Sequence, residues 1–125
     1  MPDEKIAQIG TALKGEIEAL ERNYQKINSY LSGTEIENYE IIGTLQAFKE
    51  SLNRISAHIL ALYQLKGQKT KITWEPLLEN VNSALLNMQG SRNPKPRTAI
   101  PLALNMSEPK VAEVMAYLGK LKQSL

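Results

Sequence analysis

The sequence contains no cysteine among its 125 residues. Disulfide bonds, thiolate nucleophiles and thiolate metal ligands are therefore excluded together. Aromatic residues make up only 6% of the chain, with one tryptophan and one phenylalanine, and histidine occurs once. Carboxylate-bridged di-metal centres in helical bundles need repeated Glu-x-x-His patterns. We therefore expect no metal site and no cofactor.

Long hydrophobic runs are also absent from the sequence. No stretch approaches the roughly 20 apolar residues that span a bilayer, and the first residues, MPDEK, lack the pattern of a signal peptide. The composition, 42% hydrophobic and 22% charged, is ordinary for a globular protein, and 125 residues fit one domain. We expect a soluble, cytoplasmic, single-domain protein that does not bind membranes.

Charge is small overall and unevenly distributed along the chain. The net charge is +2, which is too weak to imply a nucleic-acid partner. Residues 1–40 hold four basic and eight acidic side chains, a net of −4, whereas residues 41–125 hold eleven and five, a net of +6. Such asymmetry is typical of solvated helix faces, and it also supports self-association or an anionic partner.

Hydrophobic residues recur at helical spacing along most of the chain. The clearest stripe runs from Ile41 to Leu62 with spacings of 4-3-4-3-4-3, which match the seam of a coiled-coil-like pair. The pattern predicts four helices, over residues of about 3–31, 35–66, 74–89 and 108–123. The short Ser32-Gly33 stop between the first two helices predicts an antiparallel hairpin. The fold class is thus all-α, an irregular four-helix bundle built on a long antiparallel helical hairpin.

Residues 91–106 form the one long connection between predicted helices. Its three prolines predict an irregular linker, because proline inside a helix removes a hydrogen bond and clashes with the preceding turn. The second half, residues 99–104, is apolar, and we expect it to pack on the bundle.

The predicted helix lengths leave one end of the hairpin uncovered. At 1.5 Å per residue the first two helices are roughly 43 and 48 Å long, and the other two only about 24 Å each. Exposed apolar patches mark interaction surfaces, and tyrosine is common in interfaces. We therefore predict that the tip of the hairpin binds another protein or a second copy through Tyr24, Ile27, Tyr30, Leu31, Ile36, Tyr39 and Ile42. The alternative is that the linker carries the last helix over this tip.

One pair of residues carries possible catalytic chemistry. Arg54 and His58 lie four residues apart, so they share a face of the second predicted helix. An Arg and a His on one helix resemble the HEPN class of helical ribonucleases, in which four to six residues usually separate the pair. Here only Ile55, Ser56 and Ala57 intervene, and Ile55 replaces the polar residue that usually follows the arginine. A HEPN-like ribonuclease is the remote alternative.

Lysines gather near the second predicted connection. We predict that this end is a possible anion-binding surface, formed by Lys66, Lys69, Lys71, Lys120 and Lys122, which would neutralise phosphates by charge alone. Trp74 is expected to pack at the edge of the core. The sequence shows no phosphate-binding loop, nucleophile elbow or metalloprotease motif. The leading hypothesis is a non-enzymatic interaction or regulatory protein that self-associates, and the alternative is a small helical nucleic-acid-binding subunit.

Overall fold

The computed structural model describes residues 2–32, 36–107 and 109–125, and within them the chain is all-α, as predicted. The helices are α1 (Pro2–Ser32), α2 (Asn38–Leu65), α3 (Glu75–Gln89), α4 (Pro96–Met106) and α5 (Val111–Ser124). Two of the predicted helix starts, at residues 35 and 108, lie outside the described residues. No helix in the described part is long and apolar enough to cross a membrane.

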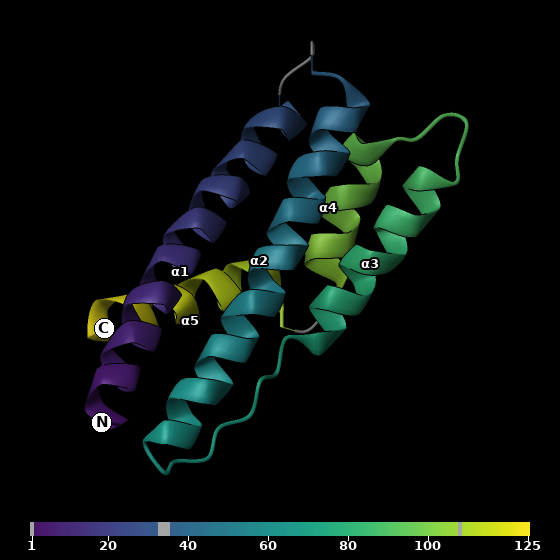
Figure 1. The fold of residues 1–125 in the computed structure, drawn as a ribbon. Coiled ribbons are helices and arrows are strands. Elements are labelled where there is room, and N and C mark those ends of the chain that lie inside the picture. Colours follow the sequence, from purple (N-terminus) through teal and green to yellow (C-terminus); the bar gives the residue numbers. More distant parts are fainter. Residues whose placement is uncertain (1, 33–35, 108) are drawn as a thin grey trace.

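The two long helices form the frame of the molecule. Figure 1 shows α1 and α2 side by side and running in opposite directions, and they share the most extensive helix–helix contact in the described residues. The predicted stripe of α2 is enclosed: six of its side chains have no exposed surface and Leu62 is 3% exposed. These six are Ile41, Leu45, Phe48, Leu52, Ile55 and Ile59. Because one face of α2 is buried along its length, its apolar residues recur at regular 4-3 spacing, and this spacing predicted the helix correctly.

The prediction of an irregular linker over residues 91–106 is wrong for its second part, which forms α4. Pro96 occupies the first turn of α4. Backbone N–H groups in the first turn of a helix have no acceptor within the helix, so the N–H group that proline lacks is not needed there. Pro101 lies inside α4 and removes one hydrogen bond there. Ile100 and Leu104 are nonetheless buried, at 0% and 3% exposure. Tertiary packing of this i, i+4 pair therefore outweighs the local cost of proline. The expectation that 99–104 packs on the bundle is confirmed for Ile100 and Leu104, whereas Leu102 is exposed.

The placement of α4 also changes the predicted tip of the long pair. Figure 1 shows α4 beginning beside the start of α2 and lying between α2 and α3. The Arg97 guanidinium donates hydrogen bonds to the carbonyl oxygens of Tyr30, at 3.4 Å, and Ile36, at 3.3 Å. The Asn38 side-chain amide donates to the carbonyl of Pro94 at 3.1 Å. Neither predicted arrangement is right: the linker itself, rather than the last helix, covers this end.

The last helix lies toward the opposite end of the long pair. Helix α5 contacts α1, and the Lys122 ammonium donates to the Glu21 carboxylate at 2.7 Å. Figure 1 shows the C-terminus close to the N-terminal half of α1. Helices α4 and α5 thus cover different ends of the frame, and the surfaces beside each are distinct.

Candidate functional site

The residues predicted to bind a partner at the tip are mostly covered. Ile27 has no exposed surface, so the prediction that it contacts a partner is wrong in this conformation. Tyr24 packs on Phe48, with ring centroids 6.4 Å apart. Tyr24, Tyr30, Leu31, Ile36 and Ile42 are partly buried against the core. Tyr39 alone of the seven is well exposed, at 70%. The long helices themselves contribute to this covering, since Tyr24 of α1 packs on Phe48 of α2, and α4 adds the contacts of Arg97 with the carbonyl oxygens of Tyr30 and Ile36.

Arg54 and His58 both lie on α2, as predicted, and Arg54 has a structural partner. Its Nε atom donates to the Glu16 carboxylate at 3.1 Å and its Nη2 atom donates to the Ser51 hydroxyl at 3.2 Å. The contact with Glu16 ties α2 to α1, and the contact with Ser51 lies within α2. His58 is partly buried one turn further along α2. Among the described residues, no cluster of three or more His, Asp or Glu side chains is placed to hold a metal ion.

The five lysines predicted to bind anions differ in their surroundings. Lys66, Lys69 and Lys71 are exposed on the connection between α2 and α3, and Lys120 is exposed on α5. Lys122 is instead paired with Glu21, and this hydrogen bond raises the pKa of its ammonium group. The connection therefore offers three exposed cations, while Lys122 fastens α5 to α1.

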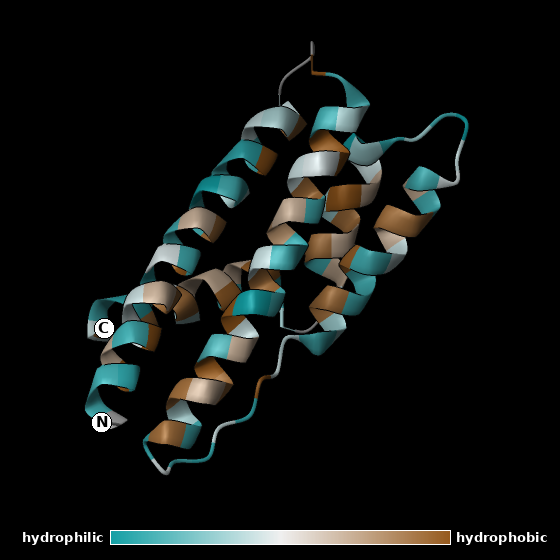
Figure 2. Cartoon of the chain, viewed as in Figure 1, coloured by the Kyte–Doolittle hydropathy of each residue, from teal (hydrophilic) through white to brown (hydrophobic). Residues whose placement is uncertain are grey.

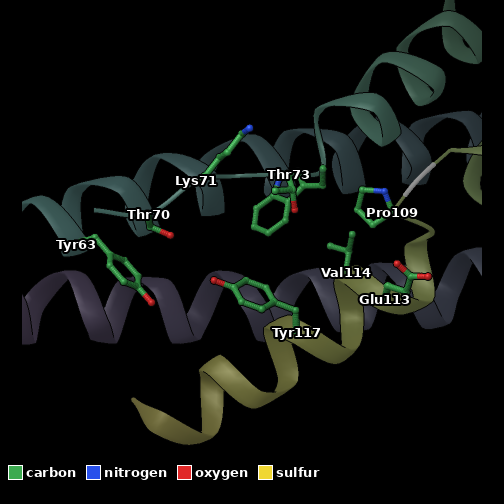
Figure 3. A pocket seen from close by; sticks show the side chains of 9 residues that line it. Tyr63, Thr70, Lys71, Thr73, Pro109, Glu113, Val114 and Tyr117 are labelled. Carbon is green, nitrogen blue, oxygen red and sulfur yellow. The ribbon is translucent and has the colours of Figure 1, made fainter. Parts of the chain in front are cut away.

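A pocket of about 460 Å³ lies beside this lysine connection. Its lining comes from three places in the chain: Tyr63 on α2; Thr70, Lys71, Thr73 and Trp74 on the connection; and Pro109, Glu113, Val114 and Tyr117 at α5. We call it the aromatic pocket. Figure 3 shows the hydroxyl ends of Tyr63 and Tyr117 directed toward the same space. The sequence did not reveal this pocket, because its three aromatic residues are far apart along the chain.

Trp74 lines the pocket and also contacts both α2 and α5. Its indole N–H donates to the Ser56 hydroxyl at 2.8 Å, and its ring lies 5.9 Å from that of Tyr117 at an angle of 55°. Trp74 is only 3% exposed, which agrees with its predicted packing role, whereas Tyr117 is 41% exposed. Burial, followed by the nearby Tyr63, raises the pKa of the Tyr117 phenol.

A second hollow is a shallow groove of about 320 Å³ between α3 and α4, which we call the α3–α4 groove. Its lining consists of Asn80, Ser83, Ala84, Asn87, Ala99, Leu102, Ala103 and Met106. A neighbouring hollow continues it past Asn87 and Leu102 toward Lys95. Leu102 and Met106 are 58% and 69% exposed. Figure 2 shows hydrophobic residues recurring along both helices.

The groove follows from the residues that α3 and α4 place toward each other. Ala84, Ala99 and Ala103 lack bulk, so the two helices leave a trough above them. Leu102 and Met106 are four residues apart and lie on one face of α4, beside the trough. The i, i+4 spacing of these two residues is present in the sequence. It indicates a shared apolar face only if residues 96–106 form a helix, which the prolines argued against.

No protein-family model matches this sequence, and no curated protein or solved structure is detectably similar to it.

Proposed function

We propose that this protein is a non-enzymatic, cytoplasmic interaction or regulatory protein that self-associates through the α3–α4 groove. The observation that carries the proposal is the pair of exposed side chains Leu102 and Met106 beside an alanine-floored trough. A monomer that left these side chains in water would forgo roughly 25 cal/mol for each Å² of apolar surface. Adjacent exposed apolar side chains around a hollow are typical of association surfaces.

A second copy is the partner that this surface fits best. A twofold dimer brings the same patch of both subunits together, so the patch must carry both a protrusion and a matching recess. Leu102 and Met106 supply the protrusion, and the trough over Ala84, Ala99 and Ala103 supplies the recess. Methionine adapts its shape to irregular recesses, which favours this fit. None of the described residues that line the groove is charged, so two copies meet there without like-charge repulsion.

The chemistry of the groove supports binding rather than catalysis. Its polar lining groups are the side-chain amides of Asn80 and Asn87 and the hydroxyl of Ser83. Amides do not titrate near neutral pH, and a serine hydroxyl needs an adjacent base to act as a nucleophile. The described lining offers no such base. The absence of cysteine suits a reducing compartment, which supports the cytoplasmic assignment.

The proposal is tested by sedimentation velocity over a range of protein concentrations. The unmodified chain is expected to sediment as a dimer, and Leu102→Asp combined with Met106→Asp is expected to be monomeric, because two carboxylates would have to be buried at the interface. Leu86→Asp is the matched control, since Leu86 is 62% exposed on α3 and does not line the groove. Equal sedimentation of the double variant and the unmodified chain would contradict the proposal.

A further inference from the structure

The aromatic pocket brings together three rings that the chain supplies from separate elements. Tyr63 comes from α2, Trp74 from the connection and Tyr117 from α5. A volume of about 460 Å³ lies within the range of small-ligand sites. Trp74 is almost fully enclosed and packs against Tyr117, which is 41% exposed as a residue. Exposed tyrosine rings stack on flat heteroaromatic groups, each base contributing roughly 1–3 kcal/mol in single-stranded nucleic-acid sites.

Hydroxyl groups give the pocket a polar side. Tyr63, Thr70, Thr73 and Tyr117 all line it, and Figure 3 shows the hydroxyl ends of the two tyrosines near each other. A hydroxyl both donates and accepts hydrogen bonds, so this set matches the mixed donors and acceptors on the edge of a nucleobase.

The positively charged side chains near the pocket lie at its rim rather than in its interior. The Lys71 ammonium points away from the two tyrosines in Figure 3, and Lys66 and Lys69 are exposed on the same connection. Outward-directed lysines suit a phosphate held at the mouth of the pocket rather than a charge held inside it. Glu113 is the acidic lining residue and lies at the far end, beside Pro109, where a carboxylate can accept a hydrogen bond from an exocyclic amine.

We propose that the aromatic pocket binds a nucleotide unit, with its base against Tyr63 and Tyr117 and its phosphate over Lys69 and Lys71. This site shares no lining residue with the α3–α4 groove, so it is independent of the proposed self-association. The unit comes either from a free mononucleotide or from single-stranded nucleic acid. The pocket recognises the chemistry that both sources share.

Binding is measured by calorimetry with adenosine monophosphate and with a short single-stranded oligoadenylate, on the chain of residues 1–125 at low salt. Quenching of Trp74, the one tryptophan in the sequence, gives an independent reading from inside the pocket. Tyr117→Ala is expected to weaken binding by about 5- to 150-fold, the equivalent of one lost stacking contact. Tyr117→Phe keeps the ring and is expected to bind more tightly than Tyr117→Ala, which separates lost stacking from a damaged fold.

Charge is tested by Lys69→Glu combined with Lys71→Glu, which should weaken binding and flatten its dependence on salt. The chain offers a matched control in Arg92→Glu combined with Lys95→Glu, which makes the same change of charge at exposed positions beyond α3. Tyr39→Ala is the control for loss of an exposed tyrosine, because Tyr39 lies at the start of α2, away from the pocket.

Tight binding of the mononucleotide, sensitive to Tyr117 and to the two lysines but not to the controls, supports the proposal and identifies a free nucleotide as sufficient. Binding of the oligonucleotide alone with the same sensitivities supports it with nucleic acid as the source. Equal losses from both pairs of charge reversals, with no effect of Tyr117→Ala, would show non-specific attraction and overturn it. Absence of calorimetric heat and of Trp74 quenching at low salt would also overturn it.

Discussion

Replacement of Arg97 by alanine probes how α4 is fastened to the long helices. The guanidinium joins the carbonyl of Tyr30, in the last turn of α1, to the carbonyl of Ile36, just before α2. A hydrogen bond from a charged donor contributes about 1.5–3 kcal/mol at good geometry. Both contacts are long, at 3.4 and 3.3 Å, and the side chain is only partly buried. We therefore assign about 1 kcal/mol to each and expect Arg97→Ala to lower the free energy of unfolding by about 2 kcal/mol.

Urea and thermal unfolding followed by circular dichroism measure this loss. For a chain of this length, about 2 kcal/mol corresponds to a fall in Tm of about 7 °C. Arg97→Lys keeps the charge but cannot fork across two carbonyls, so it should lose about half as much. Arg92→Ala is the control, because Arg92 is exposed a few residues earlier. If Arg97→Ala and Arg92→Ala differ by less than about 0.5 kcal/mol, the contribution assigned to this side chain is wrong.

Three further outcomes are expected. Ile100→Ala should cost about 2–5 kcal/mol in unfolding free energy, because Ile100 has no exposed surface, whereas exposed Asn105→Ala should cost far less; equal melting curves would refute the buried placement of α4. A phenolate absorbance titration should contain a component that ionises above the ordinary tyrosine pKa of 10.0 and vanishes in Tyr117→Phe. Because folding raises this pKa, its contribution to stability is complete below pH 10.0 and is lost as the pH rises through the folded value; a titration that Tyr117→Phe leaves unchanged apart from amplitude would argue against it. Neither the unmodified chain nor His58→Ala is expected to cleave RNA. Cleavage by the unmodified chain that disappears in His58→Ala would instead favour the HEPN-like alternative.

The helices with regular stripes could be predicted from the sequence because their apolar residues all serve one buried face. The stripe from Ile41 to Leu62 is enclosed along its whole length, and Val111, Val114 and Leu118 of α5 behave in the same way. Helix α4 could not be predicted because Pro96 and Pro101 argue locally against it. Its stability comes from contacts of Ile100 and Leu104 with distant residues, which no local rule contains.

The candidate sites were harder to predict, for a related reason. The tip was inferred from helix lengths, which take no account of side-chain contacts between α1 and α2, such as Tyr24 on Phe48, or of the contacts that Arg97 of α4 makes with Tyr30 and Ile36. The lysines of the α2–α3 connection were recognised because they lie close together in the sequence. Tyr63 and Tyr117, in contrast, are 54 positions apart and meet beside them only in the folded chain. Leu102 belonged to the segment 99–104 that was expected to pack on the bundle, whereas in α4 both Leu102 and Met106 are exposed.

Self-association is tested most directly by the molar mass of the unmodified chain, measured by light scattering during size-exclusion chromatography at increasing concentration. One chain has a mass of 14.0 kDa. Pairing through the α3–α4 groove predicts twice that value at high concentration, falling toward 14.0 kDa on dilution. A mass that stays at 14.0 kDa up to the highest concentration reached would contradict the proposed function.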